Sequence, residues 1–414
     1  MRPRVAQPNV FEKLRKIITE DPAWSLCLMH PLTKLCLKNI VKNFEEKQTL
    51  EELLPAHRDY VLGRLSTSLP LHITANLIDD PGYWRRCCVQ RWDLCDVSQY
   101  GHSWKHMFFE RHLENLVELF IPDTTPPQTI LEVVPLCRDH VRRLDTRNAS
   151  DTAILHHFDF GVLLHRLSRL EELRLVYGVR DCGINFEWNL FEFTLHDCES
   201  LAIALKSCQT LKILRLHQSK VEDERCRMLA RHLLDHPALR ELDLSHNLIG
   251  DRGAQALGKL LTSSRLEVLR LCDNEIGGPG ALAIAHALSQ GAPLRDLDLR
   301  LNRLGDEGGR ALGHALRTNG TLRRLHLGAN ELGEPSATAL AQALVQNDTL
   351  TSINLSANSL GAGGGKALEE GMSQNISVME CDVRLSEVGE ESEASISRVA
   401  RNNRDRTRLR PAGV

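Results

Sequence analysis

A repeat of about 28 residues fills the second half of this 414-residue chain and restricts its fold more than any other feature. Each copy opens with the frame L-x-x-L-x-L-x-x-N-x-L, and successive copies start 27 or 28 residues apart. The copies start at Leu211, Leu239, Leu266, Leu294, Leu322, Leu350 and Val378. A unit of this length buries its apolar face only by stacking on the next unit. The sequence therefore predicts a solenoid.

Each copy divides into a strand, a turn and a helix. The last two leucines of L-x-x-L-x-L are two residues apart, which is the side-chain period of a β-strand. An asparagine follows where the chain turns, and its amide can satisfy backbone groups that the turn leaves unpaired. The predicted structural turn residues are Asn247, Asn274, Asn302, Asn330 and Asn358. The glycines three residues later are predicted to permit the next turn: Gly250, Gly277, Gly305, Gly333 and Gly361.

The rest of each copy has helical spacing, as in Ala254, Leu257 and Leu261. Four residues at the ends of these helices are predicted to be left-handed C-caps, namely Gly291, Asn319, Asn347 and Asn375. The predicted fold class is α/β, a leucine-rich-repeat solenoid with a ribonuclease-inhibitor-like horseshoe form. A parallel sheet should line its inside and helices its outside, and a helical domain should precede it.

Four segments are predicted along the chain. Residues 1–110 form an N-terminal helical domain, where an apolar helical stripe precedes a cluster of tryptophans at Trp84, Trp92 and Trp104. Degenerate N-terminal repeats with an aromatic insertion should follow over 111–210, and the regular repeats over 211–386. Residues 387–414 should form a C-terminal capping helix near Ser392 to Asn403, with Ile396 and Val399 turned inward, and a basic tail.

Composition argues against several classes of function. The chain has 51 Lys and Arg against 54 Asp and Glu, which gives no concentrated basic charge for nucleic acid. No run of 18 apolar residues occurs, and the first residues lack the apolar core of a signal peptide. We therefore expect a cytoplasmic protein with reduced thiols that binds neither membrane nor nucleic acid.

Two sequence patterns resemble sites of chemistry but fit the repeat better. GAGGGKAL at 361–368 looks like a phosphate-binding loop, yet Lys366 is followed by alanine, and the segment aligns with GDRGAQAL at 250–257. His232, His236 and Cys226 have a spacing that would suit zinc, but each occupies a regular repeat position. We therefore expect no enzyme activity, no metal, no cofactor and no small-molecule substrate.

Three features are candidates for protein contact. The concave face should carry a column of alternating charge, either a self-neutralised ladder or a surface for a charged ligand. An aromatic cluster within the insertion is either an interface anchor or core. Arginines from Arg398 to Arg410 follow an acidic run and form either a solvated tail or a contact for an acidic filament. The predicted partner-binding residues are Phe186, Trp188, Phe191, Phe193, Arg215, Arg270, Arg300 and Arg324.

The chain resembles the T-complex-associated testis-expressed protein 1 family, the leucine-rich-repeat subunit 5 of the nexin–dynein regulatory complex. The resemblance lies in RRCCVQRW at 85–92, SWKHMFFERHLENL at 103–116, INFEWNLFEFT at 184–194 and the repeats from LLDHPALRELDLSHNLIGDRGA at 233–254 onward. The second and third segments lie outside the repeat consensus, so they make the match specific. The abrupt start also suggests that an N-terminal extension is missing.

The resemblance implies a non-enzymatic scaffold of the axoneme in motile cilia and flagella. Such a subunit helps regulate dynein-driven motility, notably of sperm, through protein–protein contacts. Its implied partners are the other subunits of the dynein regulatory complex and doublet microtubules, and its implied localisation is the cytoplasm and cytoskeleton, in the cilium or flagellum axoneme.

A second class of function stays open. Residues 53–92 have an early Leu-Pro and late tryptophans, which loosely resembles an F-box. An F-box followed by leucine-rich repeats is the architecture of a ubiquitin-ligase substrate receptor. Binding to the ligase adaptor would distinguish this class from the axonemal one.

Overall fold

The protein contains two compact units, Met1–Phe108 and Phe109–Val414, which are described separately. A computed structural model describes residues 15–16, 28–29, 31–120, 126–146, 158–177 and 193–409. The predicted boundaries at 110, 210 and 386 remain predictions.

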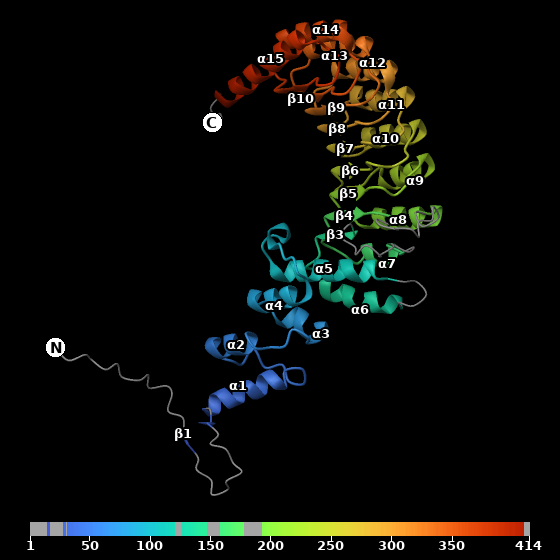
Figure 1. Cartoon of the computed structure of the whole chain (residues 1–414). Helices are drawn as coiled ribbons and strands as arrows, with labels where there is room; N and C mark the ends of the chain where they lie inside the picture. The colour runs from blue at the N-terminus through green and yellow to red at the C-terminus, as the bar shows by residue number, and fades with distance from the viewer. Residues whose placement is uncertain are drawn as a thin grey trace, which may run out of the picture. The chain divides into compact units, whose positions relative to one another are not determined.

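The described part of the first unit is mainly helical (Figure 1). Its helices are α1 (Leu32–Lys42), α2 (Pro55–Leu62), α3 (Leu71–Leu77), α4 (Pro81–Arg91), the 3₁₀ helix η1 (Val97–Tyr100) and the start of α5 (Trp104–Glu118). Two short strands, β1 (Arg15–Lys16) and β2 (Leu28–Met29), pair antiparallel ahead of them.

Trp84 is the centre of this unit. Helix α4 begins at Pro81 because the side chain of Asp80 accepts a hydrogen bond from the amide of Tyr83 at 2.6 Å. The helix then buries Trp84 completely, and its Nε1 donates to the carbonyl of Ile78 at 2.8 Å. The ring of Phe108 lies 5.0 Å from it, centroid to centroid. Each aromatic side chain buries a large apolar area, so a few such pairs contribute much of the stability of a small domain.

The second unit contains a nine-stranded parallel sheet whose strands follow chain order, with helices on its outer face (Figure 1). The strands are β3 (Arg143–Asp145), β4 (Glu172–Leu175), β5 (Ile213–Leu216), β6 (Glu241–Asp243), β7 (Val268–Arg270), β8 (Asp296–Asp298), β9 (Arg324–His326), β10 (Ser352–Asn354) and β11 (Glu380–Asp382). The helices are the rest of α5, α6 (Pro127–Cys137), α7 (Gly161–Leu164), α8 (Leu195–Ser207), α9 (Asp223–Leu233), α10 (Asp251–Ser263), α11 (Gly278–Ser289), α12 (Gly305–Leu316), α13 (Glu334–Gln346), α14 (Gly361–Gln374) and α15 (Glu390–Leu409). The predicted fold class is confirmed.

The core of this unit lies between the sheet and the helices. In register across the strands, Leu242, Leu269, Leu297 and Leu325 are each 1% exposed or less. The helices reach this layer through their small residues, of which Ala254 is fully buried. Each repeat therefore buries its leucines against the adjacent repeats and not only within itself.

The turn asparagines join each repeat to the one before it. The Asn302 side chain donates to the carbonyls of Leu299 at 3.0 Å, Arg300 at 3.1 Å and, in the preceding repeat, Leu271 at 2.8 Å. Its Oδ1 accepts the amide of Ile276, also in the preceding repeat, at 3.0 Å. The side chain is 5% exposed, so these backbone groups have little access to water.

A second row of asparagines runs along the helix ends, and here the predicted role needs correction. Of the four predicted left-handed caps, Gly291 is left-handed with φ of +82°, but Asn347 and Asn375 have φ of −90° and −87°. Their side chains act instead. The Nδ2 of Asn347 donates to the carbonyls of Leu316 at 2.8 Å and Asn319 at 2.9 Å, again across repeats.

The predicted turn glycines also divide into two groups. Gly250, Gly277 and Gly333 have φ near −100°, and the amide of each is hydrogen-bonded to an aspartate that opens the preceding helix, namely Asp223, Asp251 or Asp306. Gly305 and Gly361 lack this aspartate. The equivalent residue is Gly278 for Gly305 and Glu334 for Gly361. These two glycines are left-handed, with φ of +56° and +69°.

Side chains of α5 pair with the first strand of the sheet. Glu110 Oε1 accepts the amides of Arg142 at 2.8 Å and Arg143 at 3.1 Å, and Glu114 Oε1 accepts that of Asp145 at 2.9 Å. Burial raises the pKa of Glu110 to about 7 and that of Glu114 to about 8, although the amide donors act in the opposite direction.

The turn asparagines generate a stability prediction. Asn302→Ala should lower the free energy of unfolding by about 1–3 kcal/mol, because it leaves buried backbone groups without partners. Urea unfolding should show this loss, and hydrogen exchange should speed up around Asn274 and Asn330 in the neighbouring repeats. Asn402→Ala is the control, since Asn402 is exposed on α15. Unchanged exchange in the neighbouring repeats would contradict the cross-repeat role.

The carboxyls of Glu110 and Glu114, which contact the first strand from α5, generate a prediction about pH. Their pKa is above the ordinary value of 4.5, so the folded chain binds more protons than the unfolded chain as pH rises from 4.5 to about 8. Stability should therefore fall over this range and level off above it. Glu114→Gln keeps an oxygen acceptor but removes the titrating group. The loss of unfolding free energy between about pH 4.5 and 8 should therefore be smaller by about 1 kcal/mol or more.

Urea midpoints measured at each pH test this prediction. Glu132→Gln, at an exposed position of α6, should leave the pH dependence as it is in the unaltered chain. An equal pH dependence in the chain with Glu114→Gln would show that folding does not shift the pKa of this carboxyl.

Candidate functional site

The inner face of the sheet presents a column of polar side chains, one from each strand from β4 to β11. In register, the column reads Arg174, Arg215, Asp243, Arg270, Asp298, His326, Asn354 and Asp382. Neighbouring strands lie about 4.8 Å apart, so adjacent side chains are within reach of one another.

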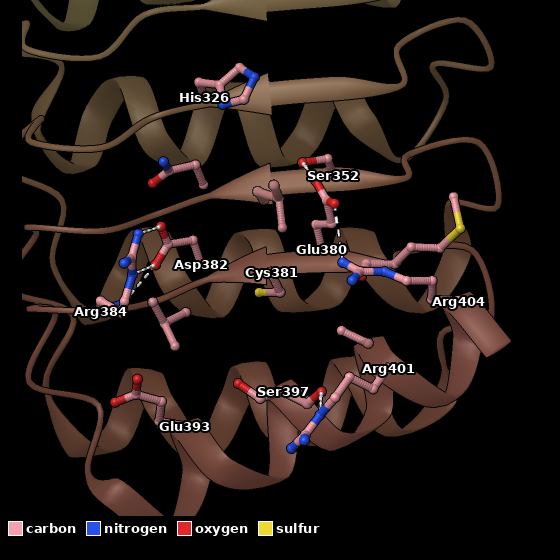
Figure 2. A pocket seen from close by; sticks show the side chains of 15 residues that line it. His326, Ser352, Glu380, Cys381, Asp382, Arg384, Glu393, Ser397, Arg401 and Arg404 are labelled. Carbon is pink, nitrogen blue, oxygen red and sulfur yellow. Dashed lines mark hydrogen bonds and ion pairs between the residues drawn. The ribbon is translucent and has the colours of Figure 1, made fainter.

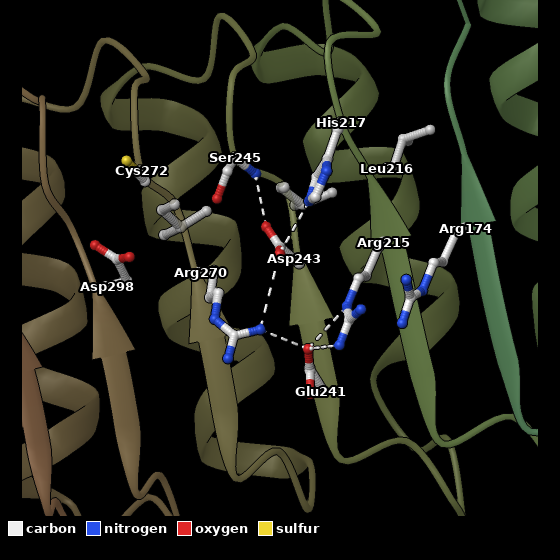
Figure 3. A network of polar contacts seen from close by, with 12 residues as sticks. Arg174, Arg215, Leu216, His217, Glu241, Asp243, Ser245, Arg270, Cys272 and Asp298 are labelled. Atoms are coloured by element: carbon white, nitrogen blue, oxygen red, sulfur yellow. Dashed lines mark hydrogen bonds and ion pairs between the residues drawn. The ribbon is translucent and has the colours of Figure 1, made fainter. Parts of the chain in front are cut away.

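Glu241 is the centre of the network in the first half of this column (Figure 3). Its Oε1 accepts from the Nε and Nη2 of Arg215 at 2.9 and 2.7 Å and from Nη1 of Arg270 at 2.6 Å. Arg215 also lies 3.3 Å from Glu172 on the preceding strand. The side chain of Glu241 is only 14% exposed, and it bridges two arginines that would otherwise repel each other.

Asp243 extends the network toward the turns. The His217 Nε2 lies 2.9 Å from its Oδ2, and the amide of Ser245 donates to its Oδ1 at 3.1 Å. Burial opposes the charge on Asp243, but the contacts with His217 and Ser245 outweigh it and hold the pKa of this carboxyl below its usual value.

The second half of the face contains separate pairs. Arg300 donates to both oxygens of Asp298, with its Nη2 2.6 Å from Oδ2, and Arg324 donates to Asp296 at 2.8 Å. The arginine side chains are 46% and 54% exposed, which is more than for Arg215 and Arg270. All four predicted partner-binding arginines therefore have a carboxylate within the chain, and their contact with another protein remains a prediction.

The aromatic insertion lies largely outside the described residues, which include neither Phe186 nor Trp188 nor Phe191. Phe193 is described, and it is a core residue with 1% exposure. Its ring centroid lies 4.3 Å from that of Tyr177, which is also buried. In this structure the Phe193 ring is thus not available to a partner.

The glycine-rich segment at 361–368 begins helix α14. Its glycines allow close packing, since a Cβ at Gly365 would overlap the carbonyl oxygen of Val388 and one at Gly364 would lie 2.8 Å from the Cβ of Ala337. The segment therefore has a structural reason for its glycines that involves no phosphate.

The histidine and cysteine candidates also have structural places. His236 is 6% exposed and occupies the position that an asparagine has in later repeats. Its Nε2 lies 2.9 Å from the carbonyl of Cys208, and its Nδ1 accepts a hydrogen bond from the amide of Leu239 at 3.1 Å. Burial lowers its pKa. Within the described ranges, no group of three or more His, Cys, Asp or Glu is arranged to hold a metal ion. The same ranges contain no helix with the length and apolar character needed to cross a membrane.

The basic segment at the C-terminal end is helical further than expected. Helix α15 runs to Leu409, beyond the predicted end near Asn403, and it includes Arg398, Arg401 and Arg404. Ile396 is fully buried, while Val399 is partly exposed. Arg410 lies outside the described residues.

Comparison with known proteins bears on these features. A family model described as leucine-rich repeat matches residues 236–258, 262–285, 292–313 and 346–368. Dynein regulatory complex subunit 5 of Macaca fascicularis is 52% identical over 310 residues, which span 69% of this chain and 62% of that protein. The same subunit of Mus musculus is 53% identical over 61% of this chain and 55% of its own length. That of Chlamydomonas reinhardtii is 34% identical over 49% of this chain and 50% of its own length.

The chain is a homologue of dynein regulatory complex subunit 5. The resemblance to the T-complex-associated testis-expressed protein 1 family is thereby confirmed. The chain spans about half to three-fifths of the length of these relatives. Among solved structures, the yeast complex of Rad7 and Elc1 aligns with 88% of this chain at 17% identity and a TM-score of 0.39. So low a TM-score says nothing about function.

Sequence reasoning missed the central member of the inner-face network. Glu241 was not predicted as a site residue, although it lies two positions before Asp243 and so on the same face of β6. That spacing was the available signal, because a carboxylate there is adjacent to the arginines of both neighbouring strands.

This network generates a prediction. Glu241→Gln should lower the free energy of unfolding by about 1–2 kcal/mol, because it removes the charge that Arg215 and Arg270 share. Glu267→Gln is the matched control, since Glu267 contacts Arg240 and Arg295 at a more exposed position and should cost less than about 1 kcal/mol. Urea unfolding at low and high salt measures both, and equal losses would show that Glu241 has no special role.

Proposed function

We propose that the protein is a non-enzymatic scaffold subunit of the nexin–dynein regulatory complex in motile cilia and flagella. It helps regulate dynein-driven motility, including that of sperm, through contacts with other subunits of the complex and with doublet microtubules. Its place in the cell is the axoneme.

The observation that carries this proposal is the identity of 52–53% with mammalian proteins named dynein regulatory complex subunit 5. The match is not confined to the repeats, since it spans 69% of this chain in the macaque alignment and the family-model matches lie between residues 236 and 368. The resemblance in the segments at 103–116 and 184–194 agrees with it.

The form of the second unit supports contact as the mode of action. Stacked repeats present an extended surface formed by successive copies of one structural unit. The arginines of the inner face are already paired within the chain, so shape and hydrogen bonding would contribute more to recognition there than net charge.

One observation favours the alternative, an F-box-like substrate receptor of a ubiquitin ligase. The segment at 53–92 folds as the helices α2, α3 and α4, and Leu54, the leucine of the Leu-Pro pair at the start of α2, is 67% exposed. An exposed leucine at this place would suit contact with an adaptor protein. The segment at 53–92 resembles an F-box only in its architecture. That is weaker support for a function than sequence identity along much of the chain.

The axonemal proposal predicts where the protein is found. In cells with motile cilia, tagged protein should stay with the axoneme after detergent extraction, and its loss should impair beating while the doublet microtubules still assemble. The tag alone is the control. Tagged protein wholly in the soluble fraction, bound to a ubiquitin-ligase adaptor, would favour the alternative and contradict this proposal.

The aromatic insertion gives a second prediction. If Trp188 and Phe191 anchor the protein to a partner, Trp188→Ala with Phe191→Ala should weaken incorporation by about 2 kcal/mol or more per anchor without changing the melting temperature. Phe193→Ala is the matched control, because its buried ring should lower the melting temperature of the isolated protein. A similar drop in melting temperature for the double variant would instead identify the insertion as core.

A further inference from the structure

Within the described residues, the outer edge of β11, the last strand of the sheet, pairs with no other strand. Alternate residues of a parallel strand face its two neighbours. The amides of Met379 and Glu380 donate to the carbonyl of Thr351 at 2.8 and 3.1 Å, and the carbonyl of Asp382 accepts from Leu355 at 2.7 Å. These bonds join β11 to β10, so the remaining groups face the other way. They are the carbonyl of Met379, both backbone groups of Cys381 and the amide of Val383.

Helix α15 occupies the position that the helix of a further repeat would take. Asn403 follows Asn375 by 28 residues, and its Nδ2 donates to the carbonyls of Asn375 and Val378, both at 3.0 Å. Asn375 makes the equivalent of the first bond, to the carbonyl of Asn347 at 3.0 Å, while its other cross-repeat bond goes to Leu344 at 2.8 Å. The helix layer is thus continued by one further helix.

The strand layer is not continued in the same way. In the described part of the chain, no strand pairs with the outer edge of β11. The Nη2 of Arg404 donates to the carbonyl of Met379 at 3.1 Å, in place of the backbone amides that the equivalent carbonyl of Thr351 receives from the next repeat. Arg404 therefore substitutes for the first hydrogen bond of a further strand and leaves the edge open from Cys381 to Val383.

A groove of about 650 Å³ lies beside this open edge, between β11 and α15 (Figure 2). We call it the edge groove, and its lining includes Cys381, Val383, Ser397 and Ala400. Its volume is within the range of pockets that bind ligands of several hundred daltons. It has backbone groups on one wall and small side chains on the other, as the site of a short strand requires.

Helix α15 carries opposite charges along the edge groove. Figure 2 shows Glu393 at the end near Arg384 and Arg401 further along the helix, between Ser397 and Arg404. The Nε of Arg401 donates to the carbonyl of Ser397 within its own helix at 3.2 Å. The acceptor in this bond is a neutral carbonyl and not a carboxylate. Arg384 and Arg404 are occupied by Asp382 and Glu380, at 2.7 and 3.1 Å. Glu393 and Arg401 are thus the groups best placed to contact a guest.

We propose that the edge groove binds an extended segment of a partner protein, which adds to the sheet as a tenth strand parallel to β11. The open amides and carbonyl would pair with the backbone of the guest, as in other cases where a peptide extends a sheet. Small or β-branched side chains fit its middle, with an acidic residue toward Arg401 and a basic residue toward Glu393. This goes beyond the proposed function, since it holds whichever complex contains the protein.

Hydrogen exchange and a probe peptide test the proposal on the full chain. The probe is a blocked heptapeptide with glutamate first, lysine last, and alternating threonine and valine between them. In the free protein the amides of Cys381 and Val383 should exchange fast and that of Glu380 slowly. The peptide should protect both outer amides at least tenfold, whereas the same peptide N-methylated at alternate residues should not.

Variants of α15 test the chemistry of the edge groove. Ser397→Trp should abolish binding by filling it. Glu393→Lys with Arg401→Glu should bind the heptapeptide at least tenfold more weakly and should prefer the peptide with its end charges exchanged. The matched control is Glu391→Lys with Arg398→Glu, at exposed positions of the same helix that do not line the groove. The charge-exchanged variant keeps the test informative if the tryptophan variant misfolds.

Several results would overturn the proposal. Equal binding of the N-methylated peptide would show that the backbone edge is not used, and absence of binding at millimolar peptide would exclude the site. Protection of Cys381 and Val383 that grows with protein concentration would identify a second copy as the occupant. Protection in the free chain that disappears when residues 410–414 are removed would identify the chain's own end instead.

Discussion

The buried asparagine amide that crosses from one repeat to the next is the interaction on which this solenoid depends. A strand of three residues gives few backbone hydrogen bonds, and each turn leaves carbonyls and amides away from water. Asn302 satisfies such groups in its own repeat and in the preceding one. Asn347 does the same at the helix ends. No repeat is therefore complete without its neighbour, which makes folding cooperative along the unit.

At the two ends of the sheet, where a neighbouring repeat is lacking on one side, side chains bond to backbone groups of the end strand. Those at one end are acceptors and those at the other end are donors. At β3, Glu110 and Glu114 offer acceptors to the free amides of the strand. At β11, Asn403 and Arg404 offer donors to free carbonyls. Each end thus uses the residue type that matches the backbone group exposed there. At β3 this places two carboxyls in a buried site, where their pKa rises.

The sequence was sufficient for the repeat, the strand and helix order and the turn asparagines, because each follows from a fixed spacing. It was insufficient where a role depends on the neighbouring repeat. Asn347 looks like a helix cap when considered alone, yet its Nδ2 donates to carbonyls of the preceding repeat. Gly305 is left-handed, and the residue 27 positions earlier, in the preceding repeat, is Gly278 and not the aspartate that bonds Gly250, Gly277 and Gly333. Glu241 likewise acquires its role from arginines on two other strands.

The paired inner face has a consequence for how quickly partners associate. Arg215 and Arg270 share Glu241, and Arg300 and Arg324 have their own aspartates, so little net potential extends from this surface into solution. Partners of a neutral surface meet it by unassisted diffusion, at about 10⁵–10⁶ M⁻¹s⁻¹, and salt changes that rate little. A complex formed through this face would assemble slowly and owe its lifetime to slow dissociation, which suits a component that is installed once and seldom exchanged.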